Sequence, residues 1–128
     1  MMRQAQTQVL RLRVLLVDDN PAYRTTVRRI LSTARDLEVV GEAEDGRASL
    51  TQASILKPDI VILDCAMPEM DGPDAARALR RLYPAIRIIG LSVGDDEECV
   101  RRMLVAGAER VVYKDDAMAG IAQAIARA

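Results

Sequence analysis

The chain contains three short, continuous apolar runs separated by amphipathic segments. Each run has four residues and is rich in branched side chains; the runs are 14–17, 60–63 and 88–91. Such runs are typical of strands buried on both faces of a parallel sheet. Two weaker segments, 37–43 with its two glutamates and the short Val111-Val112 pair, suit the edges of a sheet. The pattern therefore predicts five strands.

Helical spacing of apolar residues follows the first and last strands. Tyr23, Val27, Ile30 and Leu31 fall at i, i+4, i+7 and i+8, and Met118, Ile121, Ala122 and Ile125 fall at i, i+3, i+4 and i+7. Three more helices are predicted in the gaps 47–57, 73–82 and 97–106. Residue pairs typical of helix starts precede or open four of these helices: Asn20-Pro21, Gly72-Pro73, Asp95-Asp96 and Asp115-Asp116.

Strict alternation of strand and helix predicts an α/β fold, a three-layer sandwich with a five-stranded parallel sheet and five helices. Placing the three most apolar strands in the centre gives the strand order 2-1-3-4-5. A length of 128 residues suits one domain. We predict a polar N-terminal tail over 1–10 and a single domain over 11–128.

Composition and charge remove several classes of function. A net charge of -1 provides no broad field for nucleic acid or an anionic membrane. No apolar run approaches the roughly 20 residues that span a bilayer, and the N-terminus lacks the apolar stretch of a secretory signal. We therefore expect a soluble, cytoplasmic protein with no membrane partner and no direct nucleic-acid binding by this domain.

The absence of histidine excludes a His-based catalytic triad and makes a zinc enzyme untenable. Cys65 and Cys99 lie 34 residues apart, a spacing that suits neither a disulfide scaffold nor a zinc site. We expect both to be reduced thiols, with Cys65 a small buried hydrophobe rather than a redox group. Only two lysines occur among eighteen basic residues. A lysine directly after a predicted strand, Lys114, is therefore a candidate for a chemical role.

Polar side chains follow four of the five predicted strands. Asp18 and Asp19 follow the first strand, Asp64 the third, Ser92 the fourth, and Lys114 the fifth, after Tyr113. Ligands of such sheets bind outside the carboxyl ends of the strands, at the point where strand order reverses. Any one of these residues alone is better explained as a turn residue, a helix cap or a solvated side chain. Their joint placement favours a site.

Three carboxylates in one small volume cannot all stay ionised without a cation. Oxygen donors alone and no histidine favour Mg²⁺, which takes one or two carboxylates together with water and phosphoryl oxygens. Lys114 and Ser92 would then face the same phosphoryl group.

Five separated motifs occur in the order typical of one family: Leu15-Leu16-Val17-Asp18-Asp19-Asn20, 58–64 ending in Asp64, 67–72 ending in Asp71-Gly72, Gly107-Ala108, and Lys114. Over about residues 12–127 the chain resembles the receiver (CheY-like) domain of two-component response regulators, whose fold is flavodoxin-like. The Lys114-Asp115 pair is similar to receivers of NarL-like transcription factors.

The resemblance implies that Asp64 is the phosphoacceptor. It also implies that Asp19, Asp64 and the backbone carbonyl of Ala66 ligate Mg²⁺, and that Asp18 acts mostly through metal-bound water. Ser92 and Lys114 take the roles of the switch hydroxyl and lysine. The chain would then be a phosphoacceptor signalling domain, not a conventional enzyme, catalysing only its own phosphorylation and dephosphorylation.

The implied partners are a sensor histidine kinase or phosphotransfer protein, an output domain or effector outside this chain, and a second copy on phosphorylation. The sequence leaves open the cognate kinase and whether the receiver is free-standing or part of a longer regulator.

The chain departs from the family pattern at three positions. Val111 stands where many receivers have a switch aromatic, while Tyr113 beside Lys114 should point to the opposite side from the lysine. Val93 replaces a commonly smaller alanine and could narrow access to the phosphoryl site. Asp115 stands where many receivers have proline.

Two other functions share parts of this pattern. One is an Mg²⁺-dependent phosphohydrolase working through an aspartyl-phosphate. The adjacent Asp18-Asp19 pair differs from the Asp-x-Asp spacing of the haloacid-dehalogenase-like phosphatases, and no cap domain is evident. The other is a phosphorylation-independent binding module, which would normally have lost an acidic residue, whereas none is lost here.

Overall fold

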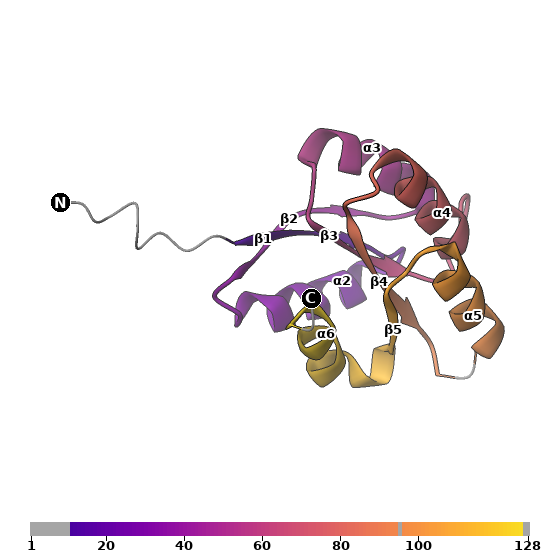
Figure 1. The fold of residues 1–128 in the computed structure, drawn as a ribbon. Helices are drawn as coiled ribbons and strands as arrows, with labels where there is room; N and C mark the ends of the chain where they lie inside the picture. Colours follow the sequence, from indigo (N-terminus) through magenta and orange to yellow (C-terminus); the bar gives the residue numbers. More distant parts are fainter. Residues whose placement is uncertain (1–10, 95, 127–128) are drawn as a thin grey trace.

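The computed structural model describes residues 11–94 and 96–126, and within them strands and helices alternate (Figure 1). The predicted tail 1–10 and Asp95 lie outside the described residues. The elements are β1 (Leu12–Val17), α2 (Pro21–Ser32), β2 (Leu37–Ala43), α3 (Gly46–Leu56), β3 (Ile60–Asp64), α4 (Gly72–Leu82), β4 (Arg87–Ser92), α5 (Glu97–Ala106), β5 (Arg110–Tyr113), the 3-10 turn η1 (Lys114–Asp116) and α6 (Ala117–Ala126).

The five strands form one parallel sheet in the order β2-β1-β3-β4-β5, which confirms the predicted order. Helices α2 and α6 cover one face, and α3, α4 and α5 cover the other (Figure 1). Each face has its own apolar core. Leu15, Leu63 and Met103 belong to the layer under α3 to α5, and Leu16, Ile62 and Ile121 to the layer under α2 and α6.

Burial along the strands follows from their composition. All five residues of β3 are buried, and in β4 only the first residue is partly exposed. β2, with its glutamates, lies at an edge and is buried only at its two ends. Branched apolar runs thus occupy the centre, where both faces of a strand are covered by helices.

Helix starts agree with the cap residues in the sequence, with one difference. The Asn20 side chain accepts hydrogen bonds from the N–H groups of Ala22 and Tyr23, and Asp96 caps α5 through the Cys99 N–H. Asp115 and Asp116, predicted to open the last helix, instead form the separate turn η1 with Lys114, and α6 begins at Ala117.

The edge strand β2 carries one extra residue relative to β1. Val14 pairs with Val39 and Leu15 pairs with Gly41, so the register shifts between them and Val40 has no partner in the ladder. This irregularity is a β-bulge, which absorbs one residue without breaking the pairing on either side.

Cys65 and Cys99 are joined by a disulfide, with their Cα atoms 6.2 Å apart. The expectation of two reduced thiols is therefore wrong for this structure. The pairing arises because the first turn of α5 packs against the carboxyl end of β3, a contact that a separation of 34 residues in sequence does not reveal.

Candidate functional site

The carboxyl ends of β1 and β3 bring three carboxylates together. Asp18 and Asp19 follow β1 directly and Asp64 ends β3; one carboxylate oxygen from each lies within 4.8 Å of the others. Asp18 and Asp64 are buried and Asp19 is exposed. The predicted cluster thus forms with one member open to solvent.

Lys114 joins this cluster from the end of β5. Its Nζ lies 2.8 Å from Asp18 Oδ2 and 3.4 Å from Asp64 Oδ1. Its side chain is 18% exposed, so the ammonium is held largely away from water. Lys114 is therefore an electrostatic partner of both buried carboxylates.

The surroundings of Asp64 favour its protonated form. Burial, together with the negative charge of Asp18, raises the pKa of Asp64 to about 7, although Lys114 opposes the rise. Burial by itself would lower the pKa of Lys114, but its hydrogen bond to Asp18 and the charge of Asp64 outweigh this and raise it. One ammonium does not neutralise three carboxylates, so the site calls for a further cation.

The donor set fits a hard divalent cation. Three carboxylates offer oxygen ligands, and exposed Asp19 leaves one side of the cluster accessible to a hydrated ion. Mg²⁺ has these preferences: carboxylate oxygens, retained waters and room for a phosphoryl oxygen. Ala66, whose carbonyl is the other expected ligand, lies on the exposed loop two residues after Asp64.

Ser92 lies at the same edge of the sheet but is not bonded to the carboxylates. It ends β4, is 1% exposed, and its hydroxyl donates a 3.0 Å hydrogen bond to the Val93 carbonyl oxygen. The neighbouring Val93 is well exposed, on the rim of an open hollow lined with Gly94, Asp96 and Asp115.

Tyr23 is a site residue that sequence reasoning used only as part of an apolar stripe. Lys114 Nζ lies 4.6 Å from the centre of its ring, and the Tyr23 hydroxyl donates to the Lys114 carbonyl oxygen at 3.2 Å. Burial and the charges of Asp18 and Asp64 raise the pKa of Tyr23 to about 12. Tyr23 therefore stays protonated and holds Lys114 at two points.

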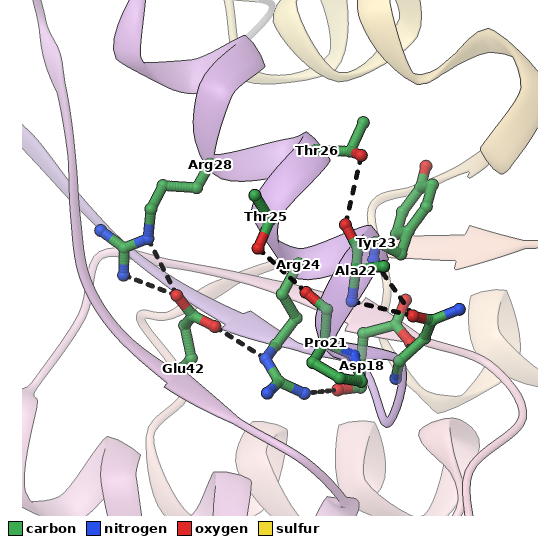
Figure 2. A network of polar contacts seen from close by, with 10 residues as sticks. Asp18, Pro21, Ala22, Tyr23, Arg24, Thr25, Thr26, Arg28 and Glu42 are labelled. Carbon is green, nitrogen blue, oxygen red and sulfur yellow. Dashed lines mark hydrogen bonds and ion pairs between the residues drawn. The ribbon is translucent and has the colours of Figure 1, made fainter.

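Arg24 and Glu42 form a second set of contacts that the sequence did not reveal (Figure 2). Arg24 donates to the Asp18 carbonyl oxygen at 2.5 Å and to Glu42 Oε1 at 2.7 Å, and Arg28 donates to Glu42 Oε2 at 2.9 Å. Burial would raise the pKa of Glu42, but hydrogen bonds from the two guanidinium groups lower it overall. Glu42 on β2 thus fixes Arg24, and Arg24 fixes the backbone that carries Asp18.

The loop after β3 returns tightly to the strand end. The Gly72 N–H donates to the Cys65 carbonyl oxygen at 2.8 Å, and a Cβ on Gly72 would overlap the Asp64 carbonyl oxygen. Glu69 in the same loop has φ 68°, in the left-handed region. Gly72 is required by this close approach of two backbone segments.

The structure thus combines a doubly wound parallel sheet with an acidic cluster and a lysine at its carboxyl edge. Residues 14–126 match the family model described as the response regulator receiver domain, and the chain belongs to this family. It is 40% identical over 114 residues to the response regulator GacA of Pseudomonas viridiflava, a match covering 89% of this chain and 53% of GacA.

Solved receiver structures share the fold of this chain over most of its length. The signal receiver domain of the putative response regulator NarL from Mycobacterium tuberculosis has a TM-score of 0.83 and 36% identity, covering 92% of this chain and 95% of that one. The isolated REC domain of RcsB from Salmonella enterica serovar Typhimurium has a TM-score of 0.83 and 27% identity, covering 91% and 86%.

The chain spans about half the length of the curated relatives it matches. It is thus a receiver domain of two-component systems with the CheY-like fold and NarL-like neighbours. Among the helices that the structure describes, none has the length and apolar content to cross a bilayer.

Proposed function

We propose that Asp64 accepts a phosphoryl group from phosphohistidine on a sensor kinase or phosphotransfer protein, in an Mg²⁺-dependent reaction in the cytoplasm. The observation that carries this proposal is the meeting of Asp18, Asp19, Asp64 and Lys114 at one edge of the sheet. A buried carboxylate beside a cation site and a fixed ammonium has the parts that phosphoryl transfer needs.

In the proposed reaction an Asp64 oxygen attacks phosphorus in line while the bond from phosphorus to the imidazole nitrogen breaks, and the imidazole leaves with the electron pair. Lys114, already 3.4 Å from Asp64 Oδ1, offsets the charge on the phosphoryl oxygens. Asp19, Asp64 and the Ala66 carbonyl would hold Mg²⁺, with Asp18 acting through its water. When bound, the ion offsets negative charge on the phosphoryl group and the carboxylates.

The phosphorylated state is read out through Ser92. Its hydroxyl is buried beside the strand that carries Asp64 but is bonded to its own loop. A phosphoryl group on Asp64 offers a stronger, charged acceptor, so Ser92 would exchange partners and pull the loop that leads into α5. Such a differential contact makes the domain a two-state switch.

The relatives support this context. The RcsB receiver structure was determined in the presence of phosphomimetic BeF3-, an analogue of the group proposed for Asp64. GacA and VraR are named response regulators of which this chain covers about half. We infer that the domain works with an output domain or effector, and that dimerisation on phosphorylation is one route to that output.

Intact mass after incubation with acetyl phosphate tests the proposal. One phosphoryl group per chain is expected with Mg²⁺ and almost none with a chelator, and Asp64→Asn should abolish labelling. Asp36→Asn, which removes an exposed carboxylate away from the site, is the matched control and should label as wild type does. Full labelling of Asp64→Asn would overturn the assignment.

A further inference from the structure

The disulfide between Cys65 and Cys99 has no part in the proposed phosphoryl transfer, yet it connects two segments that the switch uses. Cys65 directly follows Asp64, and Cys99 lies in the first turn of α5. Both residues are buried in the core layer under α3 to α5, at 2% and 7% exposure. A cross-link here joins the phosphoacceptor strand to the helix that follows Ser92.

The Cys65 end of the cross-link is firmly held. Its N–H donates to the Leu91 carbonyl oxygen at 2.8 Å, which extends the ladder between β3 and β4 by one residue. Its carbonyl oxygen accepts the Gly72 N–H at 2.8 Å, which ties it to the start of α4. Cys65 is therefore an anchor on the rigid part of the fold.

Cys99, at the other end of the cross-link, lies next to the loop that we propose moves when Asp64 is phosphorylated. The Cys99 N–H donates to Asp96 Oδ1 at 3.0 Å, so this residue is coupled to the cap of α5 and through it to the loop after Ser92. The described part of that loop has space around it: apart from its two chain neighbours, no heavy atom lies within 4 Å of where a Cβ of Gly94 would be, and Val93 and Gly94 line an open hollow. A bond from Cys99 to the anchor restricts this movement, because bridged Cα atoms stay within about 6.8 Å of each other.

We propose that Cys65 and Cys99 are a reversible thiol–disulfide pair, and that the disulfide uncouples phosphorylation of Asp64 from the displacement of α5. The uncoupling rests on the proposed function, whereas the pair itself does not. The reduced protein would respond fully to phosphorylation. The oxidised protein would accept the phosphoryl group but keep the loop after Ser92 near its unphosphorylated position.

The oxidant belongs to the class of low-molecular-weight disulfides. The thiolate of Cys99, the more exposed of the two residues, attacks one sulfur of the oxidant and releases one small thiol. The Cys65 thiolate then attacks the Cys99 sulfur of the mixed disulfide and releases the second small thiol. Two protein thiols lose two electrons and two protons, and one small disulfide is reduced to two thiols.

The first experiment counts thiols in the full chain. Protein equilibrated with oxidised or reduced glutathione is denatured, alkylated and weighed. Wild type should take up two alkyl groups after reduction and none after oxidation, and digestion of the oxidised sample should yield a peptide pair linked through Cys65 and Cys99. Cys99→Ala should take up one group after reduction and form no such link. Two free thiols in wild type under both conditions would overturn the pair.

The second experiment measures amide exchange in peptides covering the loop and first turn of α5, with and without beryllofluoride and Mg²⁺. In reduced wild type, and in Cys99→Ala under both conditions, the mimic should slow exchange by about tenfold, as expected for a typical coupling free energy. In oxidised wild type the change should fall below about twofold. Equal protection in both redox states of wild type would overturn the uncoupling.

Acetyl phosphate labelling separates this inference from the proposed function. Oxidised and reduced wild type should reach similar extents of labelling at Asp64, and loss of labelling on oxidation would contradict the uncoupling. A reduced protein that neither labels nor responds to the mimic contradicts the proposed function and with it the uncoupling. In that case the thiol count still tests, independently, whether Cys65 and Cys99 form a reversible disulfide.

Discussion

Asp64 is buried close to two charged groups: Asp18, which repels its negative charge, and Lys114, which attracts it. Burial, the larger cause, and the charge of Asp18 together raise the pKa of Asp64 to about 7 against an ordinary value of 3.8. The nucleophile that the reaction needs is the deprotonated carboxylate. A cation beside Asp64 therefore both neutralises the cluster and favours the reactive form of the residue.

The raised pKa of Asp64 predicts how stability of the metal-free protein changes with pH. Between about pH 4 and pH 7 the folded state holds a proton on Asp64 that the unfolded chain has lost. The unfolding free energy contributed by this group therefore falls as pH rises through the window, by up to about 1.4 kcal/mol per pH unit, and is fully lost above pH 7.

Asp64→Asn removes this titration, so relative to wild type it should gain about 2–3 kcal/mol between pH 5 and pH 8. Urea unfolding of both proteins in a chelator checks this. A stability difference that does not change with pH would show that Asp64 is ionised in the folded state throughout.

Asp19 differs from Asp18 and Asp64 because its side chain is exposed to solvent. Asp19→Asn should weaken Mg²⁺ binding by at least about tenfold, because it removes a metal ligand. The metal-free fold should be as stable as wild type within about 0.5 kcal/mol, or more stable, because it also removes a repulsive charge. Titration calorimetry and unfolding in a chelator measure the two effects. A clear loss of metal-free stability would make Asp19 mainly a structural residue.

At the scale of elements, the sequence predicts the positions of the strands better than it predicts which helix residues contact the site. Three branched apolar runs and two weaker segments located all five strands to within two residues at each end. The rule that parallel strands end at one edge placed Lys114 near Asp64. Tyr23 and Arg24 were missed because their contacts depend on how α2 sits on the sheet. Helical spacing gives the buried stripe of a helix but not its position along the strands.

The next prediction concerns signal transmission through the loop from β4 to α5. Ser92→Ala in reduced protein should leave acetyl phosphate labelling of Asp64 within about threefold of wild type, since attack depends mainly on the metal and Lys114. Most of the protection that beryllofluoride gives to amides of this loop should be lost, because no hydroxyl is left to bind the mimic. Hydrogen exchange measures this.

Ser54→Ala, which removes an exposed hydroxyl on α3, is the control for that experiment and should behave as wild type. If Ser92→Ala kept the full response, coupling would have to pass through Lys114 and η1 alone.

At the scale of the whole molecule, the two core layers are fastened differently. On the side covered by α2 and α6, ion pairs join α2 to β2: Arg24 and Arg28 of the helix both bind Glu42 of the strand (Figure 2). Under α3 to α5 the fastening includes the covalent bond between Cys65 and Cys99. Salt weakens the first kind of tie and reductant removes the second, so the two layers respond to different conditions.

The disulfide closes a loop of 34 residues, which restricts the unfolded chain. On this basis the oxidised protein should be about 3–4 kcal/mol more stable to urea than the reduced protein. Cys99→Ala should be insensitive to reductant and serves as the control. Equal stability of oxidised and reduced wild type would mean that strain in the folded state offsets the restriction.

The bulge in β2 determines where that strand tolerates a change of length. Val39 and Glu42 both face the layer under α2, although a regular strand would turn residues three apart to opposite sides; the unpaired Val40 makes this arrangement compatible with the ladder. A deletion of Val40 would leave Val39 opposite Val14 and Glu42 opposite Leu16, so Glu42 would still meet Arg24. An inserted residue between Gly41 and Glu42 would instead move Glu42 one position along the ladder, turn that carboxylate toward α3 and separate the guanidinium groups from their shared acceptor.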